Sequence, residues 1–256
     1  MTRAEMKSYA KAAIKNNVSV VLLISLGYLL IGLFTNNSKF SFLGLIVMIV
    51  TPILKFLTSK AALKTIDGDI INFEDTYNGI NFNYWIKIFL ANLIVSVPTI
   101  IANIIISSMI FRLGLGMFMG GHLYGHIGLY TSLASGIIVI ILLYLTGGVL
   151  SRIIELYLAF VPFIAIEKSE LSIKETLSLS KEMMEGRKME LFVMMLSFIP
   201  WWILIILLTF VLTFIPFIGF VLALFGFMLS ALIGIYYDFT VCKFYNNIKE
   251  KMYYEF

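Results

Sequence analysis

The chain has 256 residues, of which 60% are hydrophobic and 13% are charged, whereas soluble globular domains carry roughly 25% charged residues. Its longest stretch without Asp, Glu, Lys or Arg runs from Leu191 to Tyr237. As one helix this stretch would be about 70 Å long, over twice the roughly 30 Å of a bilayer's hydrocarbon core. These figures exclude a soluble globular protein and predict a single polytopic membrane domain over residues 1–256. The lone Cys242 excludes a disulfide framework, and the net charge of +4 is too small to indicate nucleic acid as a partner.

The N-terminal residues place basic side chains at steps of four, on one side of a predicted helix. They are Arg3, Lys7, Lys11 and Lys15. A basic amphipathic helix before a first span is expected to lie on an anionic inner leaflet. It would also hold the N-terminus inside, and the two roles are compatible. No cleavable signal peptide is predicted, because the first apolar run, from Val18, lacks a small-x-small cleavage site.

The hydropathy pattern predicts an all-α membrane protein with six transmembrane helices, and with cytoplasmic amphipathic segments between them. The predicted spans are Val18–Phe34, Phe40 to about Leu57, Tyr84–Phe111, about Thr131–Ser151, Leu191 to about Leu212, and about Ile218–Tyr237. Six spans place both termini on one side. Almost all Lys and Arg residues then fall on that side, and only Lys39 and Arg112 fall on the other. This asymmetry predicts a multi-pass protein of the bacterial plasma membrane with cytoplasmic termini.

Two irregular features are expected around the third span. Pro98 should kink that span, and residues 112–130 should form a glycine-rich loop before the fourth. The loop holds both histidines, His122 and His126, whose spacing of four could place them on one helical face, as in zinc sites. Because nothing nearby supplies a third protein ligand, neither a metal site nor a cofactor is predicted.

Arg152 and Glu155 interrupt the apolar run over residues 127–166, which is predicted to continue past the fourth span as an extension to Ile166. Three residues apart, they could pair on a helix. Deep in the membrane such a pair would form a functional polar site. At the cytoplasmic end of the fourth span, where the predicted topology places it, the pair would be a structural one at the interface. Lys55 is expected to snorkel from the end of the second span, and Asp238 to mark the boundary of the last.

Two cytoplasmic segments carry helix-start signals. Ser172 and Glu175 have the spacing of a capping box, and Asn72 and Asp75 have the same layout with a weaker partner. The helix that starts at Ser172 is expected to run through Gly186 directly into the fifth span.

The same two segments align at an offset of one hundred residues. Each leads to a basic residue, Lys87 or Lys188, and then to a span that carries a Ser-x(1–2)-Pro motif ending at Pro98 or Pro200. This arrangement predicts an internal repeat of span, segment and span in one orientation. Chance similarity between two capped helices is the alternative. A repeat interface in the membrane is where many transporters place their sites.

The segment from Ser180 to Trp202 carries a resemblance. Its Glu185-Gly186-Arg187-Lys188, Leu191-Phe192 and Leu196-Ser197-Phe198 motifs resemble the signature of a bacterial integral-membrane family, the domain-of-unknown-function family numbered 975. Residues 10–17 and 243–245 are similar to the two ends of that family. Where the family has Gly before Trp, this chain has Pro200 and Trp201.

The resemblance implies a multi-span architecture, a Gram-positive origin and no established activity, so it supplies no catalytic residues. The family is itself similar to the membrane half of some glycerophosphodiester phosphodiesterases, whose catalytic half has no counterpart here.

The sequence contains no His-Glu-x-x-His, no Gly-x-Ser-x-Gly and no phosphate loop, so no enzymatic activity is predicted. We hypothesise a non-enzymatic membrane protein that acts through contacts with membrane lipids, a hydrophobic peptide or a partner membrane protein. Immunity to an antimicrobial peptide, or an accessory role in its export, is one concrete form. The alternative is a transporter or flippase for an amphipathic substrate.

Overall fold

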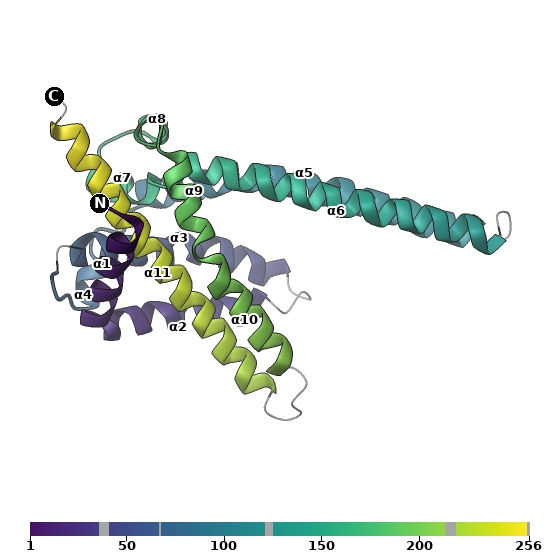
Figure 1. Ribbon diagram of the computed structural model, residues 1–256, viewed down its shortest axis with the longest axis horizontal. Helices are drawn as coiled ribbons and strands as arrows, with labels where there is room; N and C mark the ends of the chain where they lie inside the picture. The colour runs from purple at the N-terminus through teal and green to yellow at the C-terminus, as the bar shows by residue number, and fades with distance from the viewer. Residues whose placement is uncertain (36–40, 67, 121–124, 213–218, 255–256) are drawn as a thin grey trace. The chain divides into compact units, whose positions relative to one another are not determined.

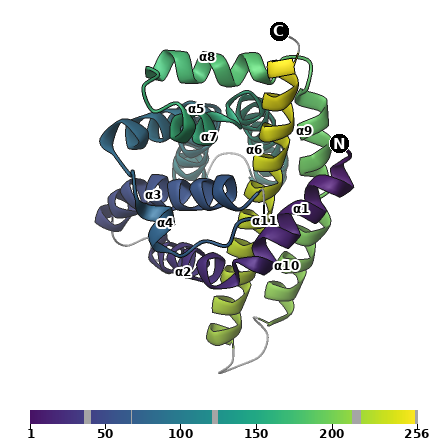
Figure 2. The same cartoon turned by 90° about the vertical axis from the view of Figure 1, so that its left-hand side faces the viewer.

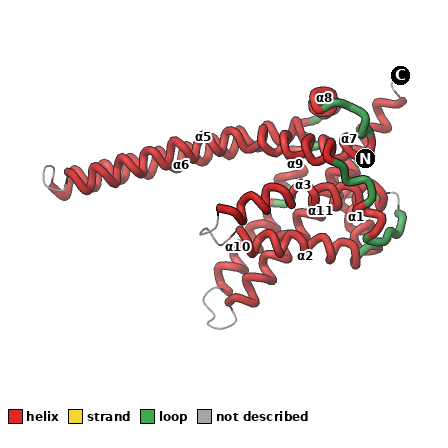
Figure 3. The backbone as a smooth tube through the Cα atoms, turned by 180° about the vertical axis from the view of Figure 1, so that it is seen from behind, coloured by secondary structure: helices red, strands yellow, loops and turns green. Residues whose placement is uncertain are grey.

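The computed structural model describes residues 1–35, 41–66, 68–120, 125–212 and 219–254, and their side chains except at 33–35, 41–48, 112–120, 125–136, 209, 211–212, 219–223 and 253–254. Within this described part every regular element is an α-helix (Figure 3), which confirms the all-α class. The helices are α1 (Arg3–Asn16), α2 (Val18–Thr35), α3 (Ser41–Thr65), α4 (Glu74–Tyr77), α5 (Phe82–Gly120), α6 (Gly125–Leu158), α7 (Val161–Glu167), α8 (Ile173–Met183), α9 (Lys188–Leu196), α10 (Ile199–Leu212) and α11 (Gly219–Tyr254).

The chain forms two compact units. The first comprises Met1–Phe89 and Leu158–Phe256, and the second comprises Leu90–Tyr157. The second unit therefore consists of most of α5 and α6, which lie side by side as a hairpin (Figure 1). All other helices, with the first turns of α5, belong to the first unit.

Helix α11 is the centre of the first unit, where it contacts α1, α2, α3 and α10. Figure 2 shows α1 lying across it. The largest buried side chains gather on the C-terminal half of α11 and on the residues around α7. Phe160 and Phe163 pack with their ring centres 5.3 and 5.5 Å from that of Tyr245. The well-packed core of this unit therefore lies near its chain termini.

The most apolar helix, α10, is largely exposed: Ile206 is 65% accessible and Phe210 is 62% accessible. A monomeric soluble protein would bury such side chains, whereas lipid tails accept them. Among the described residues, four helical segments are long and apolar enough to cross a membrane: Phe82–Phe111, Ile137–Glu167, Lys188–Leu208 and Leu224–Met252. A fifth is added if α1 and α2, bent by 94° at Asn17, are counted as one span. Several apolar spans are thus present, while the number six stays a prediction.

Within the second unit, small and hydroxyl side chains bring α5 and α6 together. A Cβ at Gly147 would lie 3.0 Å from the Cβ of Ala102 and 3.3 Å from the carbonyl oxygen of Pro98. Next to this contact the hydroxyls of Thr99 and Ser151 are hydrogen-bonded at 2.7 Å. Close approach at small residues is the usual way in which membrane helices pack.

Several predicted boundaries are wrong. The predicted loop at 112–130 is helical at both ends, because α5 continues to Gly120 and α6 begins at Gly125; the remaining residues, 121–124, lie outside the described part. Glycine breaks helices in water, but membrane helices tolerate it. The extension after the fourth span is interrupted at Ala159 and Phe160 before α7 begins. The last helix continues past Tyr237, the predicted end of the sixth span, to Tyr254.

The stretch that we expected to pass through Gly186 as one helix is divided. Helix α8 ends at Met183, and Gly186 has a φ of +73°, a left-handed conformation that suits glycine at a turn. Helix α9 then starts at Lys188. A second interruption, at Ser197 and Phe198, separates α9 from α10.

Candidate functional site

The junction between α9 and α10 lies within the longest uncharged stretch of the chain. Pro200 has no N–H to donate, and Trp201 donates its N–H to the carbonyl of Phe198 at 3.1 Å. The carbonyl of Ser197 instead accepts a hydrogen bond of 3.2 Å from the ammonium of Lys7. That ammonium also lies 4.3 Å from the centre of the Phe198 ring, a cation–π contact. The N-terminal helix therefore supplies a polar partner at the break in the apolar stretch.

Helix α1 is attached to the first unit along its apolar side. Met6, Ala10 and Ala13 are buried, so this face packs on protein rather than on lipid. The hydroxyl of Tyr236, on α11, donates to the carbonyl oxygen of Lys7 at 3.4 Å. A capping box between Thr2 and Glu5 fixes the start of the helix.

The four basic residues of α1 consequently divide into two groups. Lys7 is half-buried, and burial, followed by the nearby charge of Arg3, lowers its pKa. Arg3, Lys11 and Lys15 are exposed. Because α1 bends by 94° from α2, it would lie along a membrane surface if α2 crosses the membrane. The three exposed cations are then the members of the stripe that remain available to lipid headgroups.

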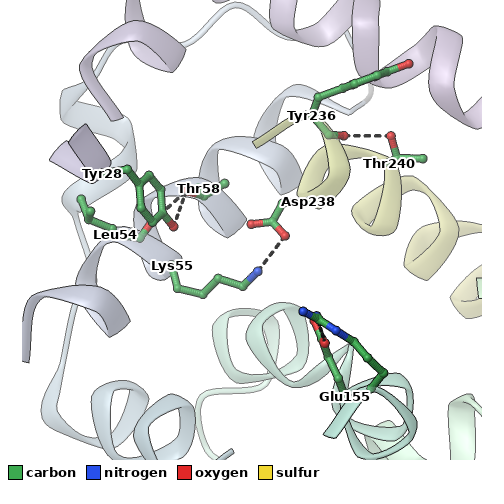
Figure 4. A network of polar contacts seen from close by, with 9 residues as sticks. Tyr28, Leu54, Lys55, Thr58, Glu155, Tyr236, Asp238 and Thr240 are labelled. Atoms are coloured by element: carbon green, nitrogen blue, oxygen red, sulfur yellow. Dashed lines mark hydrogen bonds and ion pairs between the residues drawn. The ribbon is translucent and has the colours of Figure 1, made fainter. Parts of the chain in front are cut away.

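An ion pair joins α3 to α11 in the first unit. The ammonium of Lys55 lies 2.7 Å from a carboxylate oxygen of Asp238 (Figure 4), and the two side chains are 29% and 13% exposed. In the same figure the hydroxyls of Tyr28 and Thr58 meet at 3.4 Å between α2 and α3. From the sequence, Lys55 was expected to snorkel from its span and Asp238 to mark the boundary of the last one. The structure adds that each is the other's partner.

A second polar cluster joins α7 to α11. The carboxylate of Glu167 accepts hydrogen bonds from the hydroxyl of Tyr245 at 2.7 Å and from the ammonium of Lys249 at 2.8 and 2.9 Å. The Tyr245 ring is at the same time part of the aromatic core around Phe160. Charge pairing and core packing therefore coincide at this contact.

Arg152 and Glu155 form an ion pair within α6, in the second unit. Their side chains are 64% and 33% exposed. Arg152 directly follows Ser151, whose hydroxyl is hydrogen-bonded to that of Thr99 on α5. The pairing expected from the spacing is present; its depth in a membrane stays a prediction.

Of the two predicted helix starts, one has the expected geometry. The hydroxyl of Ser172 accepts from the N–H of Glu175, whose carboxylate accepts from the N–H of Ser172 at 2.7 Å. Hydrogen bonding of the Glu175 carboxylate to Ser172, to its hydroxyl first and then to its N–H, lowers the pKa of Glu175. At the other start, Asp75 accepts from the N–H of Asn72 at 3.0 Å. The N–H of Asp75, however, donates to the main-chain carbonyl of Asn72 and not to its side chain.

The second helix start is therefore half a capping box, and α4 is only four residues long whereas α8 has eleven. Pro98 lies inside α5 while Pro200 stands near the start of α10, so the two Ser-x(1–2)-Pro motifs do not occupy equivalent positions in their helices. The internal repeat is not confirmed. His122 and His126, the candidate metal ligands, lie outside the described side chains.

The family profile described as "Protein of unknown function (DUF975)" matches residues 1–252. The chain belongs to this family. No curated protein and no solved structure matches it, and the expected similarity to glycerophosphodiester phosphodiesterases is not shown. Membership in this family fixes no activity, so the function has to be argued from the residues.

Sequence reasoning missed the contacts between distant helices. The Thr2-x-x-Glu5 spacing was a readable signal for the box on α1. Lys55 and Asp238, and likewise Glu167 and Lys249, carry opposite charges near the ends of apolar runs, but spacing alone does not say which helices are neighbours.

Proposed function

We propose that this chain is a non-enzymatic bacterial plasma-membrane protein that acts through contacts of its apolar surface with membrane lipids, a hydrophobic peptide or a partner membrane protein. The observation that carries this proposal is the α5–α6 hairpin. Only 17% of the apolar stretch within Phe82–Phe111 and 6% of that within Ile137–Glu167 are buried inside the chain. Ile104, Leu145 and Ile141 are 64%, 60% and 52% exposed. Burial of such side chains in lipid or against a partner is strongly favourable, at roughly 25 cal/mol per Å².

The proposed orientation has six spans and both termini in the cytoplasm. Lys and Arg are concentrated on the side of the termini, as the positive-inside tendency requires. The Glu167–Lys249 pair and the aromatic core around Tyr245 agree with this arrangement, because they lie on the C-terminal part of α11, on the side of the chain termini. This leaves the uncharged lengths of α5, α6 and α10 for the hydrocarbon region.

The test is a cellular one. A bacterium that lacks the native gene is complemented with the full chain, and its tolerance to a cationic membrane-active peptide is measured. Replacing Ile104 and Leu145 together by Ala should reduce tolerance at unchanged protein level. Glu155→Gln should preserve it, because no titrating group takes part in the proposed contact. A loss caused by Glu155→Gln, with tolerance unchanged in the alanine variant, would refute the proposal.

A transporter or flippase for an amphipathic substrate is the second candidate, and the Lys55–Asp238 pair is the observation that favours it. Ionisable groups paired between two apolar helices often mark a substrate or ion pathway. Purified protein in vesicles with a fluorescent phospholipid probe distinguishes the two. A transporter would raise the rate of probe exchange between leaflets, and Asp238→Asn would remove the increase. A contact protein leaves the rate at that of empty vesicles.

A further inference from the structure

Helix α5 carries a polar stripe along its transmembrane length, made of Asn92, Ser96, Thr99, Asn103 and Ser107. The steps between these residues are four, three, four and four. At about 100° per residue they fall within an arc of about 80° on one side of the helix. A stripe with this spacing on an otherwise apolar span is the pattern of a helix that contacts another helix.

The stripe is not the side of α5 that meets α6. That side is formed by buried Ala91, Ala102 and Ile106, with Ala102 against Gly147. Of the stripe, Thr99 lies at the edge and bonds to Ser151 on α6. Asn92, Ser96, Asn103 and Ser107 are exposed. The hairpin therefore leaves four of its five polar positions on α5 uncovered.

Among the residues of the stripe, the two asparagines cost the most free energy when they face lipid. The hydroxyl of Ser96 donates to the carbonyl of Asn92 in its own helix, so it is satisfied in any environment. Across the described residues, by contrast, the side-chain amides of Asn92 and Asn103 have no hydrogen-bond partner. At 1.5 Å per residue, Asn103 lies about 24 Å past Lys87 and about 14 Å before Arg112, within the hydrocarbon core. An amide at that depth needs a partner that lipid tails cannot provide.

We propose that this stripe is the contact between two copies of the chain, with α5 of one copy packed in parallel on α5 of the other. A two-fold axis along the membrane normal places equivalent residues opposite each other. A carboxamide has both a donor and an acceptor, so two copies of Asn103 satisfy each other, as paired asparagines do in coiled coils. The stripe bears no charge, so self-association brings no like-charge repulsion. Ser96 and Ser107 are small enough to let the backbones approach.

This inference deepens the proposed function, since it names a second copy as one contact partner, and it rests on that function in taking the hairpin as membrane-embedded. The parallel arrangement follows from both copies having the same orientation in one membrane. The mean step of the stripe is 3.75 residues, longer than the roughly 3.6 residues of a helical turn, which favours a right-handed crossing.

Disulfide cross-linking of the full chain in native membranes tests the contact. In a Cys242→Ser background, Ser96→Cys and Ser107→Cys each place one thiol in the stripe. The matched controls are Ile101→Cys and Ile105→Cys, which are exposed on another side of the same helix at similar depth. We expect a covalent dimer from both stripe variants upon mild oxidation and none from the controls. No dimer from the stripe variants, or equal yields at all four positions, would overturn the proposal.

A second measurement tests the role of the amides. Adding Asn103→Leu to Ser107→Cys should lower the dimer yield, with a fall in dimerisation constant of about 3-fold to 30-fold, the range of interhelical polar bonds in membranes. Asn103→Gln should retain most of it. The control is Thr146→Val, which removes an exposed hydroxyl that bonds only within α6. A cross-link within one chain, or to a protein of another mass, would refute the second copy as occupant. Peptide tolerance is measured separately in the same variants, so that a failure of dimerisation can be distinguished from a failure of the proposed function.

Discussion

The ion pair between Lys55 and Asp238 gives the sharpest test of how the first unit is held together. Asp238→Asn keeps the shape of the side chain but removes its charge, and leaves the Lys55 ammonium without its carboxylate 2.7 Å away. Lys55→Met keeps the stem of the side chain and removes the cation. The two residues are 183 positions apart in the chain, so the pair reports on the contact between α3 and α11 and on no local structure.

The expected magnitude lies between two limits. Exposed ion pairs contribute about 0–1 kcal/mol, and removing one partner of a buried pair costs about 3–5 kcal/mol. With exposures of 29% and 13%, water screens this pair only in part. Each single variant should therefore lose about 1–3 kcal/mol of unfolding free energy. The double variant should lose less than the sum of the two, by about 1–2 kcal/mol, because it leaves neither charge alone.

The assay is reversible unfolding of the purified chain in mixed micelles with increasing dodecyl sulfate, followed by tryptophan fluorescence. Lys64 and Asp75, paired at 3.1 Å with both side chains 42% exposed, provide the matched control: Lys64→Met, Asp75→Asn and their combination should show a much smaller coupling. Additive effects at Lys55 and Asp238, within about 0.5 kcal/mol, would refute the reasoning that the pair links the two helices.

Three further predictions concern other parts of the chain. Ser172→Ala should cost about 0.5–2 kcal/mol at the start of α8 and speed amide exchange in residues 173–179. Asn72→Ala should leave exchange in α4 unchanged, because that side chain does not cap. Equal effects of the two substitutions would contradict the structure. Because the pKa of Glu175 is lowered in the folded state, the protection of α8 should be full at neutral pH and fall as acid protonates the carboxylate, below the ordinary glutamate range. This pH dependence should vanish in Ser172→Ala/Glu175→Gln. Replacing Arg3, Lys11 and Lys15 by Gln should weaken binding of an α1 peptide to anionic vesicles by about 1 kcal/mol per residue, while Lys7→Met should instead destabilise the full chain; the reverse pattern would show that Lys7 is the lipid-binding residue.

The sequence was sufficient for features that depend on composition and local spacing. The uncharged run after Leu191 predicted long apolar helices, and the Ser172–Glu175 spacing predicted a capped helix start; both are present. It failed where local preference and environment conflict. Gly114, Gly116, Gly120, Gly125 and Gly128 indicated a loop, but they lie within the helices of a long apolar hairpin. The opposite error was made at Gly186. The charge pattern predicted one continuous helix, but α8 ends at Met183 and Gly186 lies in the turn that follows.

Tertiary pairing was out of reach for a different reason. Lys7 was assigned to lipid because it stands in register with Arg3, Lys11 and Lys15, and helical spacing treats the four alike. What separates it is the broken hydrogen-bond pattern at Ser197, which is 190 residues further along the chain. A single sequence shows which face of each helix is apolar and which is polar, but it does not show which other helix packs on that face.

The two units differ in how far their polar groups already have partners within the chain, and this contrast supports the hairpin as the contact surface. In the first unit, the charges between helices already have partners: Lys55 pairs with Asp238 and Glu167 with Lys249, while the ammonium groups of Lys7 and Lys87 donate to the carbonyls of Ser197 and Ser169. Because these groups already have partners within the chain, they would contribute little further free energy to the binding of another molecule. In the second unit, the amides of Asn92 and Asn103 are exposed along an apolar helix, so their hydrogen bonds are still to be made. The free energy that remains for a specific contact is therefore concentrated on the hairpin, and the first unit is the better candidate for its anchor.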